Sequence, residues 1–280
     1  MTRDPRLALR VRAARAIASR ELRELLRTPD LYVALGVALT AASLAVRSVL
    51  AEVAQEGLVA RASPLYLPLF VATVVLAFSA ATTSAVSIAR ERESGTLEVL
   101  FYGPVDAASY VVGKYVAQLL AYLALCAPLA ISLATYGWVT NLGFSADLLT
   151  GIALSVLAAA CTIAFGLLLS SVCGSIRDAI LLLVGVGLLL LGVQGGSWLL
   201  AGLPQREGAL GVAAETLAAA DRVVTLVSPY SYLDRGLQAA LLGDAAAYAI
   251  AFASPLIYAA LLLGGAIWSV EWRGVRRNEE

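Results

Sequence analysis

The chain has 280 residues, of which 60% are hydrophobic and only 14% charged, and its mean hydropathy is +0.83. A soluble domain carries about a quarter charged residues, so this composition predicts a polytopic, all-α integral membrane protein. The lack of histidine excludes HExxH zinc chemistry and a Ser–His dyad, while the formal net charge of +0 conceals a strong asymmetry along the chain.

Residues 1–30 are rich in arginine and predict an amphipathic helix parallel to the membrane. Apolar residues recur at helical spacing and arginines fill the remaining arc, a pattern typical of a helix among anionic headgroups. Pro29 is expected to end the helix, and an ordinary charged tail is the alternative. The segment lacks the apolar region and the cleavage site of a signal peptide. The apolar positions are Leu7, Val11, Ala14, Ala18, Leu22 and Leu25.

Six apolar runs follow, each long enough to cross a hydrocarbon core of about 30 Å as a helix. With the N-terminus, residues 90–114, the turn at 174–178 and the C-terminus on one side, that side holds 15 of the 20 basic residues. The basic side predicts the cytoplasm, so we expect a multi-pass protein of the plasma (inner) membrane with both termini cytoplasmic. The predicted spans are Leu31–Ala51, Leu65–Ala89, Ser109–Tyr136, Leu148–Val172, Ala179–Gly202 and Ala246–Val270.

A polar segment, Arg90–Lys114, separates the second and third spans and carries the densest charge outside the N-terminus. Within it, Gly95 and Pro104 bracket a short helix predicted to run across the membrane surface, with Glu98 on it. Three apolar side chains share one face at i, i+3 and i+4, which predicts a docking surface for a cytoplasmic partner. The alternative is a helix that rests on lipid. The three side chains are Leu97, Leu100 and Phe101.

The segment 203–245 is too polar for a seventh span and too apolar for a simple loop. It predicts two short helices on the outer side, the second beginning after Pro229 and ending at Gly243. They either lie on the surface or dip into the membrane and return. The second alternative requires packing against other spans, because backbone at membrane depth must be covered by protein.

The run ERESGTLEVLFYGPVDAASYVVGKY resembles the cytoplasmic loop of ABC-2 type exporter permeases, where a glutamate-rich entry, a GTLE core, a proline turn and a GK exit recur. ASRELRELLRTPDL resembles the family's elbow helix, and VSPYSYLDRGLQ its extracellular stretch before the last span. Phe101-Tyr102-Gly103 departs from a usually more aliphatic run. The resemblance implies a coupling helix seated in an ATPase groove, formed by Glu91, Glu93, Gly95, Thr96, Leu97, Glu98, Leu100, Phe101 and Pro104.

The resemblance divides the chain into an elbow helix at 1–30 and a six-span permease domain at 31–280, with the coupling loop at 90–114 and the extracellular helices at 203–245. It also implies a substrate path between two permeases. Small or polar residues in spans two and five are candidates for that path or for the dimer interface, or are helix-packing groups. They are Ser79, Thr82, Thr83 and Ser87, and Gln194, Gly195 and Gly196. Lys114 is expected to reach the inner headgroups.

These expectations describe the permease subunit of an ABC exporter that catalyses no bond chemistry itself. No GxxxxGK[ST] motif occurs, so we expect no cofactor on this chain, and ATP and Mg on a separate ATPase subunit. The resemblance implies two ATPases and a second permease, either a copy or a paralogue, and we expect no nucleic-acid partner. One alternative is a mechanotransmission or maturation subunit that serves an extracytoplasmic partner protein. A secondary carrier or channel is another, although no carboxylate lies at a span centre. The sequence does not name the substrate.

Overall fold

The structure is a computed structural model that describes residues 5–56, 64–97, 106–140, 147–201 and 209–276. Throughout these residues the regular elements are helices, and none of these residues lies in a strand, as the composition predicts. The helices are α1 (Pro5–Arg27), α2 (Pro29–Glu56), α3 (Tyr66–Glu93), α5 (Ala107–Val139), α6 (Asp147–Val172), α7 (Ile176–Ala201), α8 (Ala209–Val227), α9 (Pro229–Leu242) and α10 (Ala245–Arg276).

Five helices in the described part of the chain are long and apolar enough to cross a membrane: α2, α3, α5, α6 and α10. They coincide with five of the six predicted spans. The 26-residue α7 occupies the predicted fifth span, and its crossing stays a prediction. Helices α3 and α5 are longer than the apolar runs from which these two spans were predicted. Helix α5 has 33 residues. At 1.5 Å per residue α5 is about 50 Å long, so it extends well beyond a core of about 30 Å.

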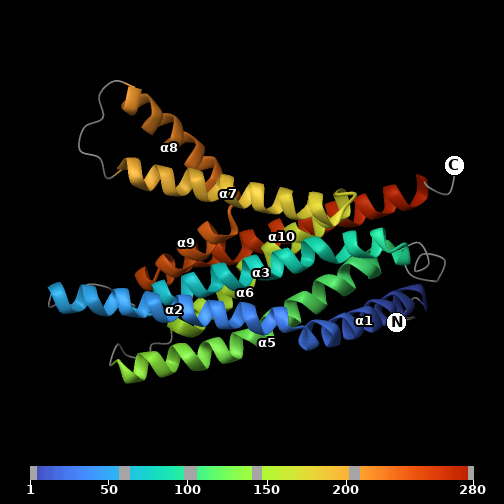
Figure 1. The fold of residues 1–280 in the computed structure, drawn as a ribbon, viewed down its shortest axis with the longest axis horizontal. Coiled ribbons are helices and arrows are strands. Elements are labelled where there is room, and N and C mark those ends of the chain that lie inside the picture. The colour runs from blue at the N-terminus through green and yellow to red at the C-terminus, as the bar shows by residue number, and fades with distance from the viewer. Residues whose placement is uncertain (1–4, 57–63, 98–105, 141–146, 202–208, 277–280) are drawn as a thin grey trace.

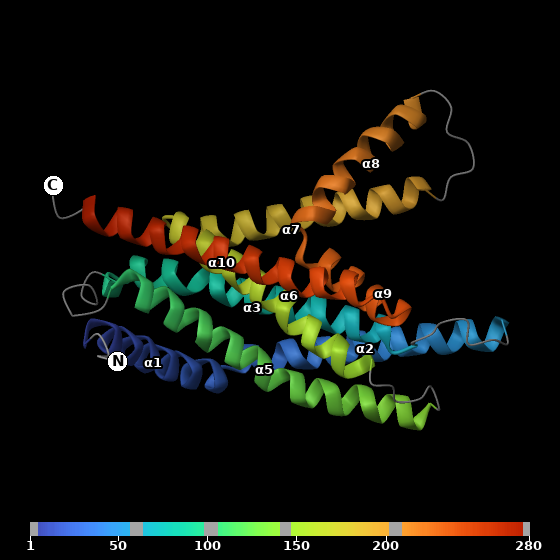
Figure 2. The same cartoon turned by 180° about the vertical axis from the view of Figure 1, so that it is seen from behind.

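Different segments of the chain lie at the two ends of the bundle (Figures 1 and 2). The start of α1, the end of α3, the start of α5, the α6–α7 turn and the end of α10 lie at one end. These segments are the ones that the distribution of arginine and lysine predicts for a single side of the membrane. The arrangement agrees with that prediction. That this side is the cytoplasmic one stays a prediction.

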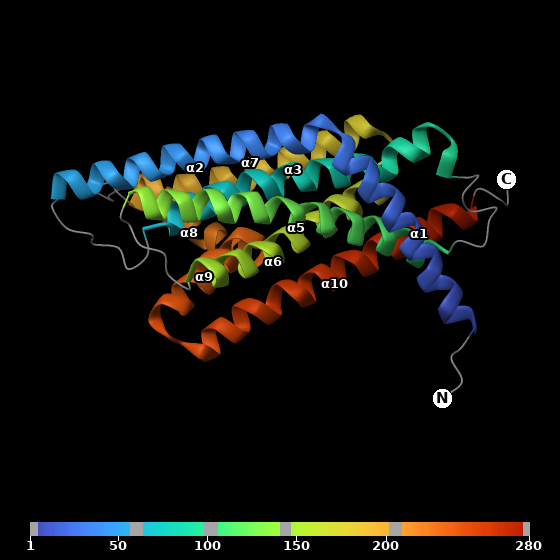
Figure 3. The same cartoon turned by 90° about the horizontal axis from the view of Figure 1, so that it is seen from below.

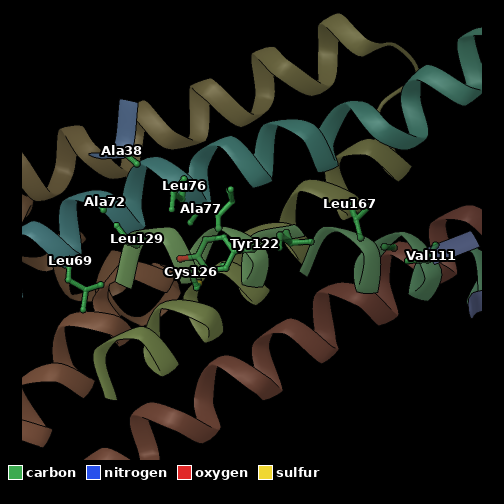
Figure 4. Packing of buried hydrophobic residues seen from close by; sticks show 14 of the residues in the cluster. Ala38, Leu69, Ala72, Leu76, Ala77, Val111, Tyr122, Cys126, Leu129 and Leu167 are labelled. Atoms are coloured by element: carbon green, nitrogen blue, oxygen red, sulfur yellow. The ribbon is translucent and has the colours of Figure 1, made fainter. Parts of the chain in front are cut away.

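The core of the bundle forms around α6, which packs most extensively against α3 and α10. Among the five spans α6 is the most enclosed, with 72% of its apolar window buried. At Gly166 a Cβ atom would lie 2.5 Å from the carbonyl oxygen of Ala81 and 2.9 Å from the Cβ of Ser84, so α3 and α6 approach closely through small residues. Larger side chains, including Leu76, Tyr122 and Leu167, fill the space between α3, α5 and α6 (Figure 4).

The N-terminal helix α1 turns away from the direction of the bundle at its junction with α2 (Figure 3). It ends at Arg27, two residues before the predicted stop at Pro29, which is the first residue of α2. The helix packs against α5, with Ile17 against the main core, whereas the sequence predicts a helix that lies among lipid headgroups. Ala18 is buried there, and the predicted member Val11 is instead 59% exposed. The periodicity therefore locates an apolar face on α1 without identifying what covers it.

The amphipathic helix α9 is covered by protein on its apolar face. Leu233 and Leu237 are buried with Leu154 and Leu157 of α6, and α9 also packs against α10. Its left-handed cap residue, Gly243, has φ +68° and leads directly into α10. This packing satisfies the condition for a re-entrant segment, and Figure 1 shows α9 beside α10 within the length of the bundle. The two alternatives for α8 and α9, on the membrane surface or dipping into it, both stay open.

Candidate coupling site at the ends of α3 and α5

The polar loop joins the end of α3 to the start of α5, and we call these two junctions, residues 91–93 and the segment that begins at Asp106, the roots of the loop. After the last helical residue, Glu93, the chain turns at Gly95, whose φ of +71° lies in the left-handed region that favours glycine. The turn is tied back to the helix, because the Thr96 hydroxyl donates to the main-chain carbonyl of Glu91 at 3.1 Å. Helical backbone resumes at Thr96 and Leu97. Leu97 is half-buried against the main core, so this member of the predicted docking face contacts the protein itself.

A buried lysine lies at the centre of the site. Lys114 Nζ is 2.7 Å from Glu21 Oε1 and 2.9 Å from Glu91 Oε1, and its side chain is only 1% exposed. The Tyr110 hydroxyl donates to the other oxygen of Glu91 at 2.5 Å. We call these four residues the Lys114 cluster. It joins α1, which supplies Glu21, to the end of α3 and the start of α5. The expectation that Lys114 extends to the headgroups is wrong, because two carboxylates of this chain hold its ammonium group.

The charges of the Lys114 cluster are nearly balanced. Two carboxylates face one ammonium group, which leaves one negative charge in excess. Arg20 offsets it from the surface: its Nη2 atom is 3.6 Å from Glu91 and 3.9 Å from Glu21. Since the side chains of Glu21 and Glu91 are 12% and 18% exposed, they depend on these partners more than a surface ion pair would.

The two residues after Glu91 bind the other side of the bundle. Arg92 donates to the carbonyl oxygens of Cys173 at 2.5 Å and Ser171 at 3.0 Å, at the C-terminal end of α6. Glu93 accepts the main-chain N–H of Ile176, the first residue of α7, at 2.7 Å. A cation at the end of one helix and an anion at the start of the next both complement the helix dipoles. Three consecutive residues of α3 therefore hold three different parts of the bundle.

Helix α1 has further contacts with α5 besides the Lys114 cluster. Gly113 permits a close approach, because a Cβ atom there would lie 2.9 Å from the carbonyl oxygen of Ala14 and 3.0 Å from the Cβ of Ile17. Near the start of both helices, Arg10 Nε is 3.3 Å from a carboxylate oxygen of Asp106. The helix is thus attached to α5 at several points along its length.

The polar residues predicted for span two mostly bind their own helix. The hydroxyls of Thr82, Thr83 and Ser87 each donate to a main-chain carbonyl of α3, the usual arrangement for a packed membrane helix. Thr83 also contacts the Gln118 amide oxygen of α5 at 3.1 Å. Ser79 and Thr83 help line a cavity of about 20 Å³, which is room for about one water molecule. This geometry is that of helix packing, and a path role for these residues stays a proposal.

The candidates in span five are only partly described. At Gly196 a Cβ atom would lie 2.8 Å from Leu217, so this glycine lies at the contact between α7 and α8. Gln194 and Gly195 are helical residues of α7, but the structure does not describe what surrounds them. Nearer its start, α7 exposes Leu181 and Leu188, with 64% and 65% of their surface accessible.

Four residues of the predicted coupling helix, Glu98, Leu100, Phe101 and Pro104, fall in 98–105, outside the described residues. The sequence did not predict two members of the Lys114 cluster. Glu21 lies in the apolar arc of α1, and Tyr110 precedes Lys114 by one helical turn. A carboxylate in an apolar arc, together with a lone cation in an apolar run, is the signal that could have paired them.

The family to which the chain belongs follows from a comparison with known families. A family model described as "ABC-2 family transporter protein" matches residues 43–268. The chain belongs to the ABC-2 transporter family. It is thus a multi-pass membrane protein of a permease family whose members are in general non-catalytic and associate with an ATPase subunit. No curated protein matches it. The match begins after α1, so the comparison assigns nothing to that helix.

Proposed function

We propose that this chain is the membrane-spanning subunit of an ABC exporter and transmits ATP hydrolysis by a separate nucleotide-binding subunit to movement across the plasma membrane. Family membership supports the permease role. The observation that carries the coupling role is the root of the loop, where Glu91, Arg92 and Glu93 each bind a different part of the bundle. A displacement of the loop therefore reaches α1, α5, α6 and α7 through direct polar contacts.

The proposed mechanism is mechanical. Closure of two ATPase subunits on ATP pulls the coupling helices at residues 95–104 and tilts α3 and α5 together. The end of the bundle that carries these loops faces the cytoplasm, in agreement with its share of arginine and lysine. Substrate or force passes along the cleft between two permeases.

The proposed working unit contains two permeases and two ATPases, since composite ATP sites need two ATPase subunits and each needs a docking point. The exposed apolar side chains of α7 are available for the contact between permeases. Mass measurement of the intact complex in detergent determines the count. A stable assembly that hydrolyses ATP with a single permease would contradict this composition.

The coupling role is tested at two residues of the predicted docking face other than Leu97. Because Leu97 packs against the bundle, we choose Leu100→Asp together with Phe101→Asp. A matched control is Leu242→Asp, a leucine that is 82% exposed at the opposite end of the bundle. The double variant should insert normally but lose ATPase binding or permease-dependent stimulation of hydrolysis, and the control should retain both. Normal copurification and transport by the double variant would refute the assignment, and transport without any ATPase would indicate a carrier or channel.

A further inference from the structure

The residues of the Lys114 cluster point to a role for α1, the helix that the family match leaves unassigned. We infer that Glu21 and Lys114 are positioning residues for coupling, and that they make α1 move with the roots of the loop as one rigid body. This inference rests on the proposed function, because it concerns how the loop transmits its displacement. It assigns no contact with ATP or with substrate to either residue.

The Lys114 cluster lies where the two ends of the loop join α3 and α5. Glu91 precedes the loop turn at Gly95 by four residues, and Tyr110 follows the start of the second root, Asp106, by four. Both roots of the loop therefore meet in the cluster. The cluster also includes Glu21 of α1. Its carboxylate is closer to the Lys114 ammonium group than that of Glu91 is, at 2.7 Å against 2.9 Å. Any change in the spacing of the two roots alters the position of the group that holds α1.

Helix α1 is attached at two separated points. Glu21 binds Lys114, and eleven residues earlier Arg10 binds Asp106, a separation of about 16 Å along a helix. Two attachments on one rod fix its direction as well as its position. Between them, Gly113 leaves no room for a side chain against α1. A helix that only floated among headgroups would need neither a buried ion pair nor this close approach.

Glu21→Gln is the most selective perturbation of this attachment. It weakens the contact between α1 and Lys114. Lys114 remains paired one to one with Glu91, so no buried charge loses its partner. The matched control is Glu24→Gln, the same substitution three residues later on α1, where the side chain is 67% exposed. Both variants are made in a background without cysteines, in which the buried Cys126, Cys161 and Cys173 are replaced by alanine.

A distance measurement on the permease alone tests the attachment without any partner. Spin labels at Arg23→Cys on α1 and Val112→Cys on α5, both exposed positions, should give one narrow distance in the parent and in Glu24→Gln. In Glu21→Gln the distribution should broaden, because α1 loses its bond to the buried Lys114 and keeps only weaker attachments, namely the exposed pairs Arg20–Glu91 and Arg10–Asp106 and its packing at Gly113. A distribution for Glu21→Gln as narrow as that of the parent would overturn the inference.

Stimulation of hydrolysis, measured on the complex purified with its ATPase, tests whether the attachment matters for coupling. Glu21→Gln should lower permease-dependent stimulation by about 5-fold or more, the lower range of allosteric coupling, while the ATPase still copurifies. Joining Arg10→Cys to Asp106→Cys with a short thiol cross-linker should restore stimulation, because it reattaches α1 to α5 by other means. Unchanged stimulation in Glu21→Gln, a loss that the cross-link does not repair, or a cross-link that blocks the parent would each overturn the inference. If the parent complex itself shows no stimulation, the proposed function fails instead, and the distance measurement still stands.

Discussion

Removal of the ammonium group from the Lys114 cluster has a cost that follows from the geometry. In Lys114→Met, Glu21 and Glu91 lose their shared cation. Their Oε1 atoms lie 2.7 and 2.9 Å from Nζ, so they are at most 5.6 Å apart. Two unit charges at that distance repel by about 3 kcal/mol at an effective dielectric constant of about 20. This value agrees with the cost of about 3–5 kcal/mol for breaking a buried ion pair from one side, so we expect a loss of stability of that order.

The assay is unfolding of the purified permease in detergent, followed by intrinsic fluorescence against added denaturing detergent. Lys114→Met should unfold at a markedly lower concentration than the parent. The variant Lys114→Met with Glu21→Gln should recover part of the loss, because only one carboxylate then remains and Arg20 and Tyr110 still contact it. If Lys114→Met is as stable as the parent, or if the added Glu21→Gln lowers stability further, the reasoning about charge is wrong.

Three other predictions address the rest of the bundle. Single cysteines in place of Asp244 and Ser94 should react with an impermeant reagent from opposite sides, the first from outside and the second only after permeabilisation; reaction of both from one side would contradict the topology. Gly166→Ala should destabilise the permease by about 1–3 kcal/mol, because its Cβ would lie 2.5 Å from a carbonyl oxygen of α3. Gly36→Ala is the control and should leave stability unchanged, because a Cβ there has no neighbour within 4 Å. Thermal unfolding compares the two variants. Tyr66→Phe, which removes the hydrogen bond from α3 to a carboxylate of α9, should cost about 1.5–3 kcal/mol and expose α9 to proteolysis, and unchanged digestion would show that this bond does not hold α9.

The sequence predicted the helices well and their lengths less well. Hydropathy ends where the side chains leave the lipid, but main-chain hydrogen bonds continue into water, so α3 runs on to Glu93 and α5 begins at Ala107. On α1 the 3.6-residue period correctly indicated an apolar face. It could not indicate that α5 rather than lipid covers that face, because a hydrophobic stripe is compatible with either environment.

For the site, the sequence located the loop but not its attachments. The charge density of Arg90–Lys114 and its resemblance to a family identified the segment. The contact between Glu21 and Lys114 joins residues 93 positions apart, and no local pattern encodes such a pair. Glu91 and Glu93 were predicted as residues of the coupling loop, and the structure shows that both carboxylates bind groups within the chain. Whether they also act on an ATPase stays a prediction.

The division of contacts at the end of α3 suggests how partner choice could be re-engineered. Residues 91–93 hold the loop to the permease through Lys114, the end of α6 and the start of α7, and Gly95 ends that section. A transplant of the loop from another permease should therefore exchange only the segment that follows Gly95 and precedes Asp106. A longer graft that replaces the sequence from Glu91 onward would cut three anchors at once, and a loss of activity would then say nothing about which ATPase the new loop prefers.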